Sequence, residues 1–262
     1  MDILTHTLSG FAAGSVIASY SSQGWKSRLG ILFFSGLGGA LPDIDAITMW
    51  SKFDVTLGRV FNLQHSGREI YSSKFWYSHH GFMHSLLAAL LIAFVIGVLF
   101  WMARQKRNPI TFIKTFYSKR LLLTGFIVGF VIHLLQDMIT PASAWGGVRF
   151  FFPSEIYIGG TGDIWWWNNY DLFLIVVFVL LVNFIILTIP GSLEIKTWKH
   201  TTLLFFIGAL CFCFQILRRD YDFNTGTYAD SEKKSKEIQK EKLGNRVYKA
   251  MDKIDNSLKV NF

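Results

Sequence analysis

The sequence has little charge for its length. Only 17% of the 262 residues are Asp, Glu, Lys or Arg, whereas 51% are hydrophobic. Few soluble domains combine so little charge with so many apolar residues. The apolar residues also form several uninterrupted runs, and a run of about 18 apolar residues is long enough to span a bilayer. The composition therefore indicates a membrane protein.

Cysteine is also scarce, and this excludes a disulfide framework. Cys211 and Cys213 stand two residues apart in one apolar run. At that spacing they point to different sides of a helix, so we do not expect them to pair. The net charge of +8 comes from basic residues in loops and a tail beside the apolar runs. That distribution is typical of membrane proteins, and we expect no nucleic-acid partner.

Six apolar segments predict an all-α fold, a polytopic bundle of about six transmembrane helices. The first two are short or rich in glycine, which favours close packing inside the bundle. We expect a membrane-embedded domain over residues 1–217 and a polar, partly helical C-terminal tail over residues 218–262. The expected helices cover residues 4–20, 29–41, 84–102, 121–140, 172–189 and 201–217.

Basic residues predict the orientation of the bundle. Residues 104–120 hold six Lys or Arg residues and no acidic residue. Lys and Arg in short loops favour the cytoplasmic side of a membrane. Residues 43–83 and 141–170 are then expected on the outer face.

Histidines and acidic residues gather at those ends of the predicted helices that face outward. Charged residues within membrane helices are costly and are functional-site hypotheses by default. The alternating direction of successive helices brings these residues to one side of the bilayer. They are His6, Asp43, Asp45, His79, His80, His84, His133 and Asp137.

Two pairs in this set have a spacing of four residues. His133 and Asp137 would lie on one helix face and together chelate one ion. His80 and His84 have the same spacing, whereas His79 stands five residues before His84 and would face about 140° away on an ideal helix. Helix geometry therefore favours His80 over His79.

A mixed set of imidazoles and carboxylates suits a divalent metal, zinc first, or manganese or iron where carboxylates dominate. The set is too large for one tetrahedral ion and favours two ions bridged by a carboxylate such as Asp43, so we expect one or two ions in all. Such ions activate water and stabilise charge on a displaced oxygen. This chemistry fits hydrolysis of an ester or phosphodiester. Taken singly, the same residues also allow a buried ion pair or turn-capping aspartates.

These residues stand in motifs that resemble the YdjM-like family of bacterial inner-membrane proteins, described as LexA-regulated metal-dependent hydrolases. The resemblance covers roughly residues 1–160. Its motifs are Thr5-His6 with Gly10, Gly39-Ala-Leu-Pro42-Asp43-Ile-Asp45, His79-His80-Gly81-Phe-Met-His84-Ser85 and His133-Leu-Leu-Gln-Asp137-Met-Ile-Thr140. The spacing of His133 and Asp137 is also similar to part of the site of bacterial zinc-dependent phospholipase C.

The resemblance implies that His79 and His84 take the places of the two histidines of the family motif. His80 stands where the family has arginine, and it either binds an anionic group when protonated or joins the metals. We therefore favour His79 as the ligand and keep His80 as the alternative. Asp45 is expected to orient a ligand or to act as general base. The expected ligands are His6, Asp43, His79, His84, His133 and Asp137.

The sequence thus predicts a metal-dependent hydrolase of the bacterial inner membrane, with its site on the periplasmic face. A site at headgroup level favours a lipid or lipid-linked substrate, and Arg149 is the candidate for binding a substrate phosphate. One alternative is a metal transporter, which would need polar groups continuing through the bilayer. The other is a non-enzymatic scaffold whose tail binds a protein partner.

Overall fold

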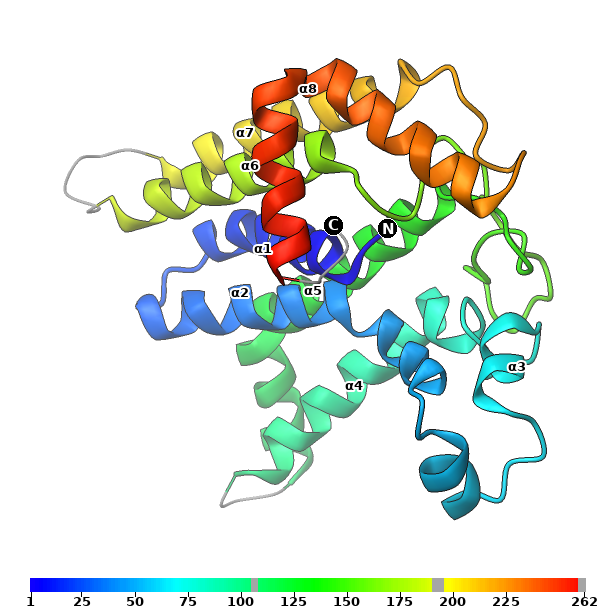
Figure 1. The fold of residues 1–262 in the computed structure, drawn as a ribbon. Coiled ribbons are helices and arrows are strands. Elements are labelled where there is room, and N and C mark those ends of the chain that lie inside the picture. The colour runs from blue at the N-terminus through cyan, green and yellow to red at the C-terminus, as the bar shows by residue number, and fades with distance from the viewer. Residues whose placement is uncertain (105–107, 190–195, 259–262) are drawn as a thin grey trace.

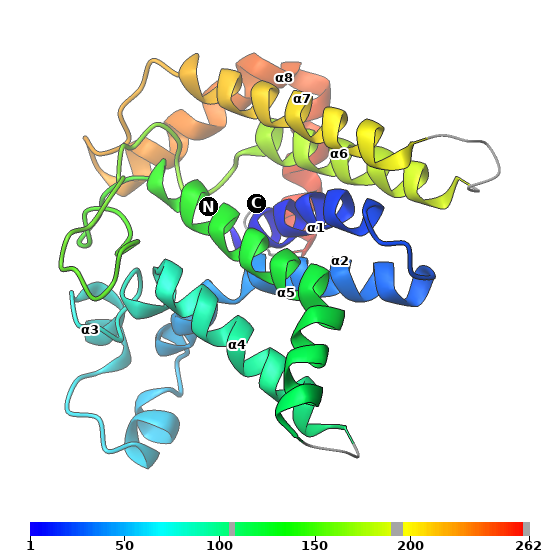
Figure 2. The ribbon, with the colours of Figure 1, turned by 180° about the vertical axis from the view of Figure 1, so that it is seen from behind.

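A computed structural model describes residues 1–104, 108–189 and 196–258. Within these ranges the chain is all-α, and the only β contacts are two isolated bridges, so the predicted fold class is confirmed (Figures 1 and 2). The elements are α1 (Ile3–Ser19), α2 (Trp25–Ala40), η1 (Pro42–Met49), η2 (Asp54–Gly58), α3 (Gly67–Ser72), η3 (Phe82–His84), α4 (Leu86–Met102), α5 (Pro109–Met138), α6 (Tyr170–Thr188), α7 (Thr197–Leu217) and α8 (Tyr228–Leu258).

Each of the six predicted apolar segments forms a helix. Among the described residues, α5, α6 and α7 are long and apolar enough to cross a membrane. The α2 helix and η1 meet at a bend of 46° and make a fourth span if they are counted together. The α1 and α4 helices are apolar but have 17 residues each. They lie at the short end of the length needed to cross the hydrocarbon core.

The α5 helix begins at Pro109, twelve residues before the start that the hydropathy predicts. Asn108 caps it, because the Asn108 side chain accepts from the N–H of Thr111 and the Thr111 hydroxyl accepts from the N–H of Asn108. Pro109 at the first helical position has a backbone angle that suits a helix start. The basic segment 104–120 is therefore largely helix and not a loop, and its residues 105–107 lie outside the described ranges.

The α4 helix begins at Leu86, after His84 instead of at it. The hydroxyl of Ser85 accepts from the N–H of Ala88 and caps the helix. Before it the chain makes a tight turn in which His80 has a positive φ of 62°. His79, His80 and His84 are thus not on one helix, and the expectation based on their helical spacing is wrong.

Glycines let α1, α2 and α5 approach backbone to backbone. A Cβ atom on Gly39 of α2 would collide with the main-chain oxygen of His6 in α1. A Cβ atom on Gly129 of α5 would collide with the main-chain oxygen of Ser35 in α2. Small residues permit such close packing of membrane helices. This packing brings the ends of the three helices that carry the predicted ligands to one place.

The C-terminal tail forms α8, which is interrupted at Gly244 and lies across α6 (Figure 1). Ile238 and Met251 on α8 are buried. The guanidinium of Arg219, two residues after the end of α7, makes a buried ion pair with Asp171 of α6 at 2.8 Å. One face of the tail is therefore packed on the membrane-embedded helices and is not solvated.

Candidate metal centre

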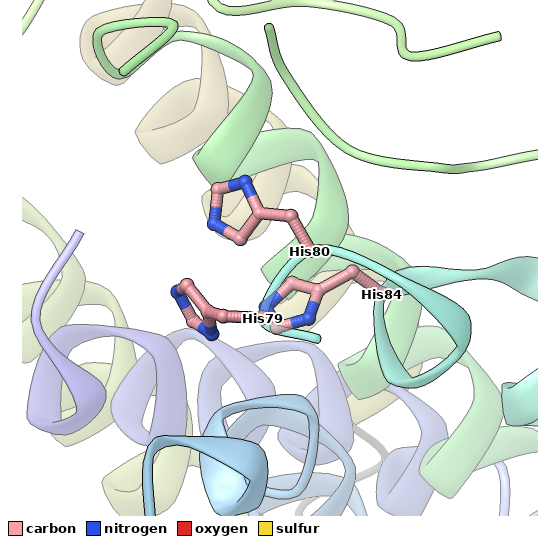
Figure 3. A group of neighbouring side chains, drawn as sticks. All are labelled: His79, His80 and His84. Carbon is pink, nitrogen blue, oxygen red and sulfur yellow. The ribbon is translucent and has the colours of Figure 1, made fainter. Parts of the chain in front are cut away.

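The structure brings four of the predicted ligands together at one end of the bundle. They are Asp43 of η1, His84 of η3, and His133 and Asp137 of α5, and each offers a ligand atom within 4.8 Å of the others. A second group that meets the same limit consists of His79, His80 and His84 (Figure 3). His84 belongs to both groups, so they form one continuous cluster.

His133 is held so that its Nε2 faces the centre of the cluster. Its Nδ1 lies 2.7 Å from the main-chain oxygen of Gly39. A carbonyl oxygen only accepts hydrogen bonds, so Nδ1 carries the proton. The Nε2 atom lies 2.9 Å from Oδ2 of Asp137 and 3.5 Å from Oδ1 of Asp43. The predicted pair His133 and Asp137 therefore does share one helix face.

His84 and His79 are both oriented by Asp45. The Oδ1 atom of Asp45 accepts from Nδ1 of His79 at 2.7 Å. Its Oδ2 atom lies 3.3 Å from Nδ1 of His84. The Nε2 of His84 is thereby directed at Asp137 and Asp43, at 3.4 and 3.6 Å. A carboxylate behind an imidazole commonly orients a histidine ligand of a metal.

His6 approaches the cluster from α1 in the same manner. Its Nδ1 donates to Oε1 of Gln136 at 2.9 Å, and its Nε2 lies 3.0 Å from Oδ1 of Asp137. The His6 ring stacks on that of His133 with centroids 3.8 Å apart. The main-chain ammonium of Met1 is also 3.0 Å from Oδ1 of Asp137.

His80 points its Nε2 at the cluster too, at 3.9 Å from Oδ2 of Asp137. Its Nδ1 donates to the main-chain oxygen of Gly147 at 2.8 Å. Both His79 and His80 are thus near the cluster, because the tight turn replaces the helix that the spacing suggested. That His79 is a ligand, with His80 as the alternative, stays a prediction.

The cluster fits a bound cation. Among the described residues, two buried atoms that face its centre have no hydrogen-bond partner: Nε2 of His6 and Oδ2 of Asp137. A buried polar atom without a partner costs about 1–3 kcal/mol. Imidazole Nε2 atoms with their Nδ1 already protonated present lone pairs to carboxylate oxygens, which repel them unless a proton or a cation lies between. The donor set suits zinc or another divalent transition metal.

The surroundings of His80 and His84 shift the pKa values of the two residues in opposite directions. Burial lowers the pKa of His80 well below its usual value, and the neighbouring His79 and His84 lower it further. Burial also acts to lower the pKa of His84, but the surrounding carboxylates, that of Asp45 above all, raise it well above its usual value. A neutral His80 is competent as a ligand, whereas His84 must lose its proton to bind a metal.

Residues 1–221 match the family model described as YdjM inner membrane protein. The chain belongs to this family. The match extends beyond the motifs within residues 1–160 and includes α6 and α7. No curated protein and no solved structure matches the chain. Membership in the YdjM inner membrane protein family, together with the apolar helices, makes this an inner membrane protein.

In this member of the YdjM inner membrane protein family, aromatic rings cover His79 and His80, the two histidines of the tight turn (the turn histidines). Tyr71 of α3 stacks on His79 with centroids 4.5 Å apart. Trp145 lies edge-on to His79 at 5.0 Å and over His80 at 4.7 Å. The Trp145 indole donates to the main-chain oxygen of Tyr71. These two rings form an apolar wall beside the cluster and limit the access of water.

Arg149 is buried in its own loop. Its Nε donates to the main-chain oxygen of Ser154 at 2.7 Å, and its NH2 donates to that of Pro153 at 3.1 Å. The guanidinium also lies over the Phe152 ring, 4.9 Å from its centroid. These contacts shape the loop next to His80, whose main-chain oxygen accepts from the N–H of Arg149. A role in binding a substrate phosphate stays a prediction.

Sequence reasoning missed the groups that orient the imidazoles from behind. The main-chain oxygens of Gly39 and Gly147 carry no side-chain signal, so no pattern reveals them. Gln136 did offer a signal, because an amide within an apolar membrane helix needs a partner. Its position directly before Asp137 placed it beside the site.

Proposed function

We propose that this protein is a membrane-embedded, metal-dependent hydrolase that cleaves an ester or phosphodiester bond in a lipid or lipid-linked substrate at the outer face. One observation carries the proposal. The Nε2 of His133 lies 2.9 Å from Asp137 while its Nδ1 donates to the main-chain oxygen of Gly39. That arrangement is characteristic of a histidine prepared to bind a metal.

The cluster has enough ligands for one or two ions. One ion would be held by His133, Asp137 and Asp43, together with His6 or His84. A second would lie towards the turn histidines, with His79 or His80 among its ligands. A bound divalent ion supplies Lewis acidity, which polarises the carbonyl or phosphoryl oxygen of the bond to be cleaved.

The chain itself positions the reacting groups. Both oxygens of Asp45 face imidazoles, so we assign Asp45 to orienting His79 and His84 in preference to acting as general base. The Tyr71 and Trp145 rings hold the turn histidines from the other side. A preorganised set of ligands with limited water is what electrostatic stabilisation of a developing oxyanion requires.

The position of the cluster supports a lipid substrate. His133 and Asp137 lie in the last turns of the membrane-crossing helix α5, and Asp43 lies just beyond the end of α2. We therefore expect the cluster at the level where lipid headgroups meet the hydrocarbon core. An ester or phosphodiester of a membrane lipid reaches that level without leaving the bilayer.

The proposal is tested with protein purified in detergent, stripped by a chelator and reloaded with zinc or manganese. Release of fatty acid or of a phosphorylated headgroup from mixed phospholipid vesicles is measured by mass spectrometry. Reloaded protein should be active, whereas stripped protein and His84→Ala should not. His200→Ala is the matched control, because His200 is exposed at the start of α7. Equal activity in His84→Ala would refute the proposal.

Metal transport is the second candidate, and one observation favours it. Buried polar side chains continue from α1 into α6 and α7, where Asn183 donates to Ser15 at 2.9 Å and Thr201 donates to Ser19 at 2.9 Å. These groups are uncharged and are hydrogen-bonded to one another, so hydrolysis stays the first candidate. Uptake of zinc into proteoliposomes, lost in His133→Ala, would favour transport.

A further inference from the structure

An apolar groove lies beside the metal centre, between α1, α5, α6 and α7. Its volume is about 470 Å³. This is within the range of about 300–1,000 Å³ that is usual for small-molecule sites. No Asp, Glu, Lys, Arg or His is among the described residues that line it. Its walls include Ala12, Ile132, Val176, Phe205, Ala209 and Phe212.

The groove has the length of one leaflet. Along α5 it extends from Val128 to the C-cap residue Ile139, and on α7 from Phe205 to Ile216. Each range comprises eleven steps, which at about 1.5 Å per residue is roughly 16 Å. Half of the hydrocarbon core of a bilayer is about 15 Å thick. The groove therefore matches one extended hydrocarbon chain running along a single leaflet.

The groove borders the metal centre at its polar part. Ser9 and Gln136 line it, and the amide of Gln136 donates to the Ser9 hydroxyl at 2.8 Å. The oxygen of the same amide accepts from Nδ1 of His6 at 2.9 Å. Gln136 is thus a direct link between the groove and an imidazole of the cluster, and Asp137 is the next residue.

The groove is open at its side. Leu135 is about half exposed, and Cys213 is exposed as well. Both residues lie on helices that are long and apolar enough to cross the membrane. At this depth the surroundings are lipid chains, and an apolar groove without charge offers them dispersion contacts only.

We propose that this groove binds one hydrocarbon chain of a membrane lipid, with the polar end of that lipid at the metal centre. Occupancy by the chain follows from the length, apolarity and side opening of the groove. The direction of the lipid rests on the proposed function, because it assumes that the ester or phosphodiester reacts at the cluster. The substrate class is then a lipid that is recognised by one hydrocarbon chain in the groove and that places its ester or phosphodiester bond at the metal centre.

Photo-crosslinking tests the occupant without reference to activity. The protein is reconstituted into phosphatidylethanolamine and phosphatidylglycerol vesicles containing a trace of phospholipid with a diazirine in one acyl chain. After irradiation, labelled positions are mapped by mass spectrometry. We expect labelling concentrated on Leu135, Ala209 and Cys213. Equal labelling of Leu203 and Leu210, which face outward on α7 and do not line the groove, would show only annular lipid and overturn the proposal.

The second measurement repeats the labelling with a variant in which a large side chain fills the groove. Ala209→Trp places a large ring in the groove, and Leu210→Trp places the same ring on the exposed face of α7. In Ala209→Trp the labelling of Cys213 should fall to that of outward-facing residues, whereas in Leu210→Trp it should remain. Leu203 faces outward on α7, outside the groove, and serves as the internal reference in both proteins. Unchanged labelling of Cys213 in a folded Ala209→Trp protein would contradict the proposal.

Metal content and hydrolysis, measured on the same samples, separate the two proposals. Specific labelling of the groove without hydrolysis by any metal-loaded sample would refute the proposed function and support the groove. Hydrolysis with even labelling of the lipid-facing residues would refute the groove and support the proposed function.

Discussion

The Nδ1 atom of His79 lies 2.7 Å from Oδ1 of Asp45. The other oxygen of this carboxylate lies 3.3 Å from Nδ1 of His84. One acidic residue thus orients two imidazoles that come from opposite ends of a short turn. Asp45 itself is supplied by η1, the bent continuation of α2. The site therefore depends on contact between η1 and the segment before α4.

Substitution Asp45→Asn should lower metal affinity without abolishing it. The amide keeps the shape of the carboxylate but loses the charge that favours imidazole ligands. Loss of such a supporting group typically costs about 10–100-fold in metal affinity. Competition against a fluorescent zinc chelator measures the change. Glu155→Gln, at an exposed acid in the loop before α6, is the control and should bind like the parent. Parent-like affinity in Asp45→Asn would show that Asp45 does not support the ligands.

Substitution Gly39→Ala should destabilise the bundle. The added methyl group meets the main-chain oxygen of His6, so α1 must move away from α2. Overpacking of this kind costs roughly 1–3 kcal/mol. Thermal unfolding in detergent gives the comparison with Gly24→Ala, since no atom of the described residues lies within 4 Å of a Cβ atom on Gly24. Equal stability of the two variants would argue against close contact of α1 and α2.

Substitution Gln136→Leu should weaken both stability and metal binding. His6 loses the acceptor for its Nδ1, and an unsatisfied buried group costs about 1–3 kcal/mol. His6 is then free to turn away from Asp137. Gln64→Leu, in an exposed loop, is the matched control. A Gln136→Leu protein that melts and binds zinc like the control would exclude Gln136 from the site.

Substitution Arg219→Ala should loosen the packing of α8, because Gln239 of α8 donates to the same Asp171 carboxylate with which Arg219 pairs. It leaves the carboxylate of Asp171 buried without its cation, and breaking a buried pair costs about 3–5 kcal/mol. Lys236→Ala removes a partly exposed partner of Glu232 and should change stability by less than about 1 kcal/mol. Limited trypsin digestion of α8 reports the difference. Equal protection of α8 in both variants would contradict the packing described above.

The sequence predicts the helical class and the main part of the cluster for physical reasons. Apolar runs identify helices irrespective of tertiary contacts, and a spacing of four residues places His133 and Asp137 on one face. The alternation of helix direction adds His6 and Asp43 at the same end. These inferences depend only on local geometry and on the thickness of a bilayer.

Other features depend on tertiary contacts that no spacing encodes. His79 and His80 both approach the cluster because of a turn with positive φ at His80, not because of helical periodicity. The early start of α5 depends on the cap formed by Asn108 and Thr111, which hydropathy does not detect. The main-chain oxygens that orient His133 and His80 belong to Gly39 and Gly147, far away in sequence.

Elemental analysis of the His133→Ala/Asp137→Ala double variant tests the central claim most directly. Parent and variant are purified in detergent, stripped, reloaded with zinc and freed of excess metal, with helical content checked by circular dichroism. We expect one or two zinc ions per parent chain and none on a helical double variant. Unchanged zinc content in the double variant would contradict a metal centre at these residues.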